Sequence, residues 1–323
     1  MTEKQISQFI PVQEGFIPTI KIIGVGGAGG NVVTQMAEES FDQVETIVCN
    51  TDAKALKRNK ANKKIELGKK LTRGMGAGAR PEVGESAAEE SMKEIGETIE
   101  GADMVFLAAG MGGGTGTGAA PAIARLAMEK QILTVGIVTI PFTFEGSKRR
   151  SSAIAGVERL REFTDTLLVI PNDKLLDAST QNTSFLEAFH MVDMVLINAI
   201  RGITMLLSGV GDINVDFADV QTIMKGMGKA VIGRGVAKGK DRALNAVEDA
   251  LHGSLMEDTD IRGAKGILVQ VSGPKDTSAY EIQEAMALIE DMADEDVELI
   301  WGATFSKTEK DELTMTVIAT GLP

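Results

Sequence analysis

Nine residues, Gly110–Gly118, read GMGGGTGTG and directly follow the apolar run Met104–Ala109. The apolar run predicts a buried strand, and the segment Ala119–Met128 predicts a helix that tolerates Pro121 only in its first turn. Glycine permits positive φ angles and a close approach of ligand to backbone, and N–H groups at a helix N-terminus bind phosphate. A flexible linker is the alternative, but linkers do not usually join a buried strand to an apolar helix. The segment therefore predicts a phosphate-binding loop.

Composition and charge exclude several classes of protein. The 323 residues are 43% hydrophobic and 24% charged, as in soluble globular proteins of about two domains. A net charge of −13 without a long basic block argues against nucleic acid or an anionic membrane as partner. One cysteine, Cys49, excludes an intramolecular disulfide, and with only two histidines a zinc site is not expected. We find no signal-peptide pattern and no apolar stretch of membrane-spanning length, so we expect a cytoplasmic protein without direct membrane insertion.

Apolar strands alternate with helices through the first half of the chain. The expected strands are residues 19–23, 44–50, 104–109, 132–140 and 166–170. Continuous apolar strands that alternate with helices predict a parallel sheet covered on both faces. Residues 184–207 predict one long helix that is apolar on nearly all sides and is therefore buried between two domains. The rest predicts a smaller α+β domain with helices near 216–224, 242–251 and 280–292, and strands near 266–271, 297–301 and 313–319.

An earlier glycine loop, residues 24–30, leaves two nucleotide classes open. Its glycines match the dinucleotide fingerprint GxGxxG, and Asp52 follows the next strand, as in an NAD(P)-dependent oxidoreductase. The second glycine-rich loop, Gly110–Gly118, argues instead for two phosphate-binding loops after neighbouring strands. A Walker A loop is absent, because the nearest approach, Gly235–Lys240, is followed by Asp241 where serine or threonine is required. Phosphate charge must then be met by backbone N–H groups, threonine hydroxyls and a metal ion on the phosphates.

Four segments in order resemble the tubulin/FtsZ family of GTPases. Gly110–Gly118 resembles the tubulin signature loop in its FtsZ form, and the other three are Gly24–Asn31, Pro141–Arg149 and Asn214–Val220. The resemblance extends from Ile20 to Gly321 and implies an α/β fold: a tubulin-like GTPase domain with a Rossmann-like parallel sheet, a long central helix and a smaller α+β domain. The boundaries we expect are a flexible arm (1–18), a GTP-binding domain (19–183), the central helix (184–208) and a C-terminal activation domain (209–323).

The resemblance also implies which residues surround the nucleotide. Those expected around it in the two glycine loops are Gly26, Gly27, Ala28, Gly29, Gly30, Asn31, Gly114, Thr115, Gly116 and Thr117. Ala77 and Gly78, within the long loop 68–84, would meet the γ-phosphate. The cofactors implied are GTP and GDP, with Mg²⁺ bound mainly through the phosphates and no metal-ligating side chain assigned.

Five side chains would contact ribose and base. Glu145 would accept from the ribose hydroxyls, Arg149 would lie near the phosphates or ribose, and Asn172 would contact the base or ribose. Phe189 would stack on the purine, and Asp193, one helical turn away, would accept from guanine N1–H and the exocyclic amine, which selects GTP over ATP. The alternatives are a solvated ion pair for Glu145 and Arg149, a core position for Phe189 and a solvated charge for Asp193.

The hydrolytic groups are expected from a different part of the chain. Asp216 and Asp219 begin a helix, where acidic residues are commonly caps or partners of the helix dipole. The resemblance implies instead that Asn214, Asp216 and Asp219 enter the pocket of the next subunit and complete it in trans, in a head-to-tail filament. The same resemblance implies a cell-division ring at mid-cell and membrane anchors that this sequence, ending at Pro323, does not identify. An oxidoreductase and a nucleotide-binding regulator without turnover remain the alternatives.

Overall fold

The computed structural model describes residues 17–38, 44–177, 182–207, 211–253, 255–256, 261–306 and 311–323. All but the last two residues of the predicted arm (1–18) lie outside these ranges. Within them, one sheet has the strand order β3-β2-β1-β4-β5-β6-β7-β10-β8-β9. The strands are β1 (Ile20–Val25), β2 (Val44–Asn50), β3 (Lys63–Glu66), β4 (Met104–Gly110), β5 (Leu133–Ile140), β6 (Thr166–Pro171), β7 (Gly228–Lys238), β8 (Gly266–Pro274), β9 (Glu298–Ser306) and β10 (Glu312–Thr320).

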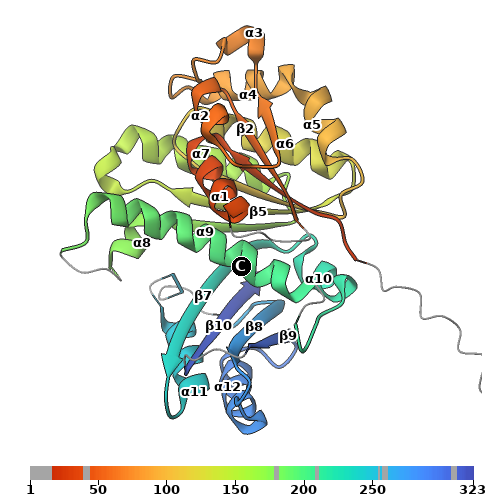
Figure 1. Cartoon of the computed structure of the whole chain (residues 1–323), viewed down its shortest axis with the longest axis vertical. Helices are drawn as coiled ribbons and strands as arrows, with labels where there is room; N and C mark the ends of the chain where they lie inside the picture. Colours follow the sequence, from red (N-terminus) through yellow and green to blue (C-terminus); the bar gives the residue numbers. More distant parts are fainter. Residues whose placement is uncertain are drawn as a thin grey trace, which may run out of the picture.

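Helices cover this sheet in both halves of the chain. They are α1 (Gly26–Glu38), α2 (Ala53–Arg58), α3 (Lys69–Thr72), α4 (Pro81–Glu90), α5 (Met92–Ile99), α6 (Thr115–Glu129), α7 (Ser147–Arg161), α8 (Asn172–Asp177), α9 (Phe185–Leu207), α10 (Phe217–Met224), α11 (Arg242–His252) and α12 (Ala279–Met292), with a short 3-10 helix, η2, at Thr143–Glu145. Figure 1 shows α9 crossing between an N-terminal part and the strands β7 to β10. The predicted α/β fold class is confirmed.

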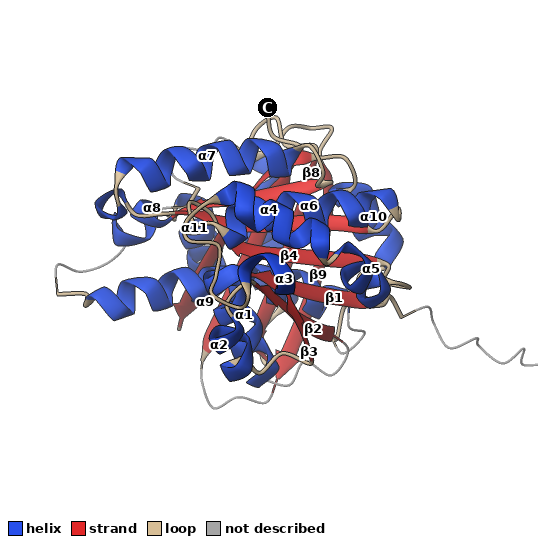
Figure 2. Ribbon diagram, turned by 90° about the horizontal axis from the view of Figure 1, so that it is seen from above, coloured by secondary structure: helices blue, strands red, loops and turns tan. Residues whose placement is uncertain are grey.

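The strands β1 to β7 pair in parallel, and among them β1, β4 and β5 are buried on both faces along nearly their whole length. In β1, Ile22 packs with the core of α1 and α9, whereas Ile23 and Val25 pack with the core of α4 to α7. Figure 2 shows these helices on opposite sides of the strands. Burial on both faces explains why these strands are continuously apolar and not alternating.

Helix α9 joins the two parts of the molecule. Its residues Leu196, Ile200 and Ile203 are fully buried between the N-terminal sheet and the inner face of β8 and β10. By length and hydropathy α9 could cross a membrane, so our statement that no apolar stretch is long enough was wrong. In this fold 56% of its most apolar window is buried inside the protein. Its apolar character thus serves the core between the two parts.

The C-terminal part contains a strand that the sequence did not predict. Strand β7 pairs in parallel with β6 and antiparallel with β10, so it links the two halves of the sheet. A Cβ on Gly233 or Gly235 would lie 1.9 Å from a backbone carbonyl oxygen of α11, so only glycine permits this close packing. Helices α11 and α12 cover the outer face of β8 and β10, and α9 covers the inner face.

Both glycine-rich helices begin earlier than predicted. Helix α1 starts at Gly26 and α6 at Thr115, so Gly26, Gly27, Gly29, Gly116 and Gly118, which were expected in loops, lie in first helical turns. A Cβ on Gly29 would lie 2.2 Å from the carbonyl oxygen of Ala108, and one on Gly118 would lie 1.9 Å from that of Pro81. These glycines therefore allow the helices to pack directly on neighbouring backbone. For the same reason Pro121 falls in the second turn of α6 and not in its first.

Candidate nucleotide site

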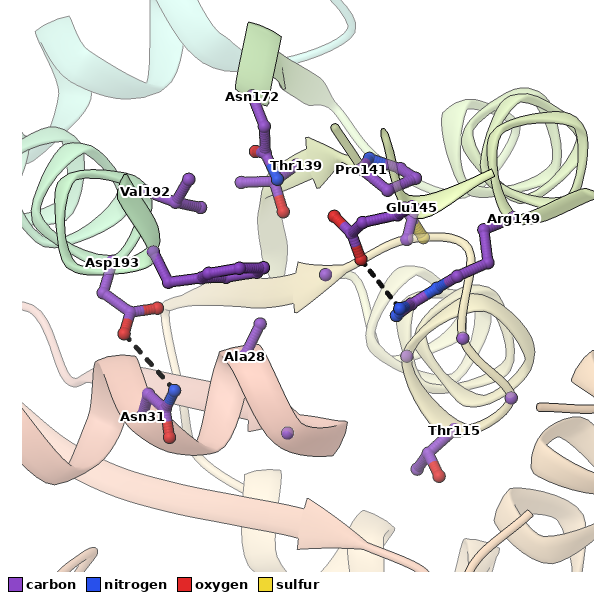
Figure 3. A pocket seen from close by; sticks show the side chains of 17 residues that line it. Ala28, Asn31, Thr115, Thr139, Pro141, Glu145, Arg149, Asn172, Val192 and Asp193 are labelled. Carbon is purple, nitrogen blue, oxygen red and sulfur yellow. Dashed lines mark hydrogen bonds and ion pairs between the residues drawn. The ribbon is translucent and has the colours of Figure 1, made fainter. Parts of the chain in front are cut away.

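A cavity of about 320 Å³ opens at the carboxyl ends of β4 and β5, beside the N-termini of α1 and α6 (Figure 3). This edge of a parallel sheet is the usual ligand site in α/β folds. Eleven of the predicted nucleotide residues line it: Gly27, Ala28, Asn31, Gly114, Thr115, Gly116, Glu145, Arg149, Asn172, Phe189 and Asp193. It is also lined by residues that were not among the predicted individual contacts: Gly110, Met111, Gly113, Thr139, Pro141 and Val192.

Six predicted residues do not line this cavity. Gly26 and Gly30 line a neighbouring cavity of about 370 Å³, and Gly29, in α1, packs on Gly24 and Ala108 of the sheet. The Thr117 hydroxyl accepts from the Gly112 N–H at 2.8 Å, so it fixes the shape of the loop from inside. Ala77 and Gly78 belong to the loop between α3 and α4, and the side chain of Ala77 packs on Gly114.

The α6 end of the cavity can bind phosphate. Gly114 is the N-cap of α6, and no side chain caps the helix. The free N–H groups of a first helical turn point toward the cavity and favour an anion. The Thr115 hydroxyl bonds the Thr51 hydroxyl at 2.7 Å, which ties this turn to the end of β2. Sequence reasoning missed Thr51, although its place directly after the β2 strand was a usable signal.

Glu145 and Arg149 form the opposite wall of the cavity (Figure 3). Their side chains are paired at 2.7 Å, and Glu145 also accepts from the Phe142 N–H at 3.0 Å. The Glu145 side chain is only 10% exposed, so the predicted alternative of a fully solvated pair does not fit its carboxylate. Both contacts fix the carboxylate beside the cavity, where it can accept from hydroxyl groups.

Asp173 supports this wall from outside the cavity and was missed in the sequence. It accepts from the Thr143 N–H at 2.9 Å and hydroxyl at 2.7 Å, and from Arg150 at 3.0 Å. Burial acts to raise the pKa of Asp173, but these hydrogen bonds and the Arg150 charge outweigh it and hold the pKa below its ordinary value. The turn that carries Glu145 is thereby fastened to α7 and α8.

The α9 end of the cavity presents groups suited to a purine. Asn31 donates to Asp193 at 3.3 Å, and the two face the cavity opposite Glu145 and Arg149 (Figure 3). Asn172 is 4% exposed, and its buried side-chain oxygen has no hydrogen-bond partner among the described residues. Because an unpaired buried acceptor is costly, this oxygen is suited to a donor supplied by a ligand.

Four phenylalanines form a closed ring of contacts beside this end. Phe189 lies 5.3 Å from Phe142 and 4.9 Å from Phe185, measured between ring centroids. Phe144 closes the ring, at 4.8 Å from Phe142 and 5.7 Å from Phe185. Such contacts restrict the ring of Phe189, which lines the cavity and can stack on a flat base. Phe189 thus packs against the core and also lines the cavity, and its stacking on a base stays a prediction.

The predicted hydrolytic residues do not reach this cavity within one chain. Asp216 is the N-cap residue of α10 but accepts no capping hydrogen bond, and Asp219 follows in the first turn. Both are exposed, as is Asn214, whose amide bonds the backbone of Gly211. The carboxylates of Asp216 and Asp219 have no partner among the described residues. At about 1.5 Å per residue, α9 alone separates Phe189 from Leu207, just before this segment, by about 27 Å.

Asp52 caps a helix and lines neither of the two cavities described above. Its carboxylate accepts from the Lys54 N–H at 2.8 Å and the Ala55 N–H at 3.1 Å, and so caps α2. In a dinucleotide fold the corresponding acid would bind a ribose. The oxidoreductase alternative thus loses its ribose ligand.

We expect the binding of a guanine base beside Asp193 to depend on pH. Burial raises the pKa of Asp193 to about 6, against the opposing effects of the Asn31 hydrogen bond and the His190 charge. A raised pKa means that the carboxylate gains a proton as the pH falls through about 6. We expect guanine nucleotide affinity to fall about tenfold between pH 7 and pH 5, because only the carboxylate accepts both guanine donors.

Binding titrations across this pH range test the expectation. A His190→Gln variant is the control, because His190 lies close to Asp193 and its charge acts on the Asp193 carboxylate. The control should show the same decrease in nucleotide affinity with falling pH as the wild-type protein. If the affinity of His190→Gln no longer depends on pH, the pH effect belongs to the imidazole, and the expectation is contradicted.

Comparison with known proteins identifies the family. Residues 19–180 match the Tubulin/FtsZ family, GTPase domain, and residues 228–323 match the FtsZ family, C-terminal domain. An FtsZ dimer from M. jannaschii is 44% identical, covering 95% of this chain and 89% of its own, with a TM-score of 0.91. CetZ2 from Haloferax volcanii, a GTPγS-bound protofilament, shares the fold at 23% identity and a TM-score of 0.79, over 94% of this chain and 93% of its own. The fold and cavity are thus those of a tubulin-type GTPase domain. This chain belongs to the tubulin/FtsZ family.

Proposed function

We propose that this protein binds and hydrolyses GTP and that hydrolysis requires assembly of its subunits head-to-tail. In the proposed filament, Asn214, Asp216 and Asp219 of one subunit enter the nucleotide cavity of the next. The two carboxylates would orient and polarise the water that attacks the γ-phosphorus. On the basis of family membership, we propose that the filament works in the cytoplasm, at the division ring.

The observation that carries this proposal is the separation of two parts of the site, the nucleotide cavity and the acidic segment with Asp216 and Asp219. We call these two parts the half-sites. The cavity has groups for phosphate, ribose and base, but its lining lacks any free carboxylate near the α6 N-terminus. The exposed carboxylates of Asp216 and Asp219, which have no partner among the residues that the structure describes, lie instead beyond the far end of α9. The solved FtsZ dimer and the CetZ2 protofilament support self-association as the way to bring such half-sites together.

The cavity fits GTP at each of its ends. The α6 N-terminus suits the phosphates, Glu145 suits the ribose hydroxyls, and Asn172 and Asp193 suit the donors of guanine. Mg²⁺ would be held mainly by the phosphate oxygens and would neutralise charge that develops during transfer. The residues of the chain bind and orient the nucleotide around it.

The dependence of GTPase activity on protein concentration tests the proposal. Specific activity should be near zero in dilute solution and should rise steeply above a threshold at which high-speed pelleting first detects assemblies. Constant specific activity down to dilute monomer would show that one chain is sufficient. No turnover at any concentration, with GTP bound, would favour a regulator without turnover; preference for ATP or NAD would remove the guanine assignment.

A further inference from the structure

The nucleotide cavity has little positive charge for a triphosphate. Among the described residues that line it, Arg149 is the only cation, and Glu145 already pairs with it. Asp193 and Glu145 contribute two negative charges. Mg²⁺ and helix N–H groups offset part of the phosphate charge, but γ-phosphates in other nucleotide sites commonly bind a lysine or arginine as well. A cation near the γ-phosphate position must therefore come from a residue outside the lining.

The backbone of Arg80 lies directly against the phosphate end of the cavity. A Cβ on Gly114, the N-cap of α6, would lie 2.9 Å from the Arg80 nitrogen and 3.1 Å from its carbonyl oxygen. The Arg80 N–H donates to the Ala77 carbonyl at 3.1 Å, and its carbonyl accepts from Val83 and Gly84 at the start of α4. The position of Arg80 is thus fixed from three sides beside the α6 N-terminus.

The side chain of Arg80, in contrast, is free to move. It is exposed, and its guanidinium forms no hydrogen bond or ion pair with the described residues. Its Nε lies 3.9 Å from the position that a Cβ on Gly78 would occupy. The guanidinium therefore lies over the part of the α3–α4 loop that would meet the γ-phosphate. A planar guanidinium can donate two parallel hydrogen bonds to phosphate oxygens.

Arg73, in the same loop, provides a comparison. It is also exposed and also lacks a partner among the described residues. The next residue, Gly74, packs on Ala53 of α2, where a Cβ would lie 2.7 Å from the alanine side chain. Arg73 is thus anchored toward α2, whereas Arg80 is anchored at α6.

We propose that Arg80 binds the γ-phosphate from within the same chain and is a catalytic residue of the GTPase reaction. This inference rests on the proposed GTPase function. With GTP bound, the guanidinium supplies the positive charge that the cavity lining lacks, and it steadies the charge that builds up on the γ-phosphoryl group during transfer. With GDP bound, it has no γ-phosphate to bind. Arg80 therefore distinguishes the two nucleotides and couples the α3–α4 loop to hydrolysis.

Binding of GTPγS and of GDP to the full chain, below the assembly threshold, tests this role. We expect Arg80→Gln to lower the affinity for GTPγS about tenfold and to leave the affinity for GDP unchanged, because a charged bidentate contact to one phosphate is lost. Arg80→Lys should lie between, since lysine keeps the charge but not the fork. Arg73→Gln, which removes the same charge from the same loop, should change neither affinity.

Turnover above the threshold provides a second measurement. Arg80→Gln should lower turnover at saturating GTP by about tenfold or more, whereas Arg73→Gln should not. Equal losses for GTPγS and GDP, or equal effects of the two variants, would overturn the assignment in favour of a general effect of loop charge. If the wild-type chain binds no guanine nucleotide, the proposed function fails. If the wild-type chain prefers GTPγS to GDP and Arg80→Gln keeps that preference, only the role of Arg80 fails.

Discussion

Asp219→Asn is expected to retain GTP binding and to lower GTP turnover by about 10²- to 10⁴-fold, the usual contribution of a positioned acid–base group. Asp219 is exposed and unpartnered among the described residues, so the substitution removes a charge without disturbing a contact in the fold. Nucleotide binding, assembly by pelleting and phosphate release should be measured on the same preparation. Asp296→Asn, which removes an exposed charge elsewhere in the C-terminal part, is the matched control and should keep wild-type turnover.

Mixing two inactive variants tests whether the acid acts across subunits. Asp219→Asn binds GTP but lacks the carboxylate, whereas Asp193→Ala supplies the carboxylate but binds guanine poorly. If the site is completed in trans, a mixture should hydrolyse GTP faster than either variant alone. Co-pelleting of the two variants without any gain in turnover would contradict completion in trans, and wild-type turnover of Asp219→Asn alone would remove Asp219 from the mechanism.

Asp193→Asn is expected to change the base preference from guanine to xanthine. In the proposed complex the carboxylate accepts from N1–H and the exocyclic amine of guanine, whereas the amide of asparagine would direct a donor at one of these positions. Xanthine has an oxygen where guanine has the amine, so the amide donor gains a partner with XTP and meets another donor with GTP. Unpaired polar groups in a buried site cost enough that the XTP-to-GTP affinity ratio should rise about 100-fold or more.

Competition binding with GTP and XTP measures this ratio. Asp193→Ala is the control, because it should lose affinity for GTP without gaining affinity for XTP. An unchanged ratio in Asp193→Asn would show that Asp193 does not contact the base edge. The Asn31 hydrogen bond to Asp193 can persist through the side-chain oxygen of asparagine, so the substitution preserves the local packing.

The sequence predicted those elements whose apolar pattern is set by burial on both faces. The strands β1, β4 and β5 and the helix α9 were found in this way. Strand β7 was missed because Gly233 and Gly235 interrupt its pattern where α11 crosses it. The starts of α1 and α6 were placed too late because glycine in a first turn was interpreted as loop, although close packing on neighbouring backbone required it.

The candidate site was predictable to a similar extent. Glu145, within a motif, and Asp193, on the predicted long helix, both line one cavity, as expected for two neighbours of one ligand. The pair Thr51 and Thr115, the support from Asp173 and the internal role of Thr117 depend on how distant segments pack. No local pattern encodes such contacts, so they needed the three-dimensional arrangement.

The position of the cavity and the acidic segment at opposite ends of α9 has an arithmetic consequence. A linear row of n such subunits, joined as proposed, contains n cavities but only n − 1 junctions. At one end, the terminal subunit holds a nucleotide whose cavity receives no Asp216 and Asp219 from a neighbour. At the other end, the Asp216 and Asp219 of the terminal subunit enter no cavity. Short rows therefore keep a larger fraction of their bound nucleotide unhydrolysed than long rows do. The two ends of every row also differ chemically from the moment the row forms.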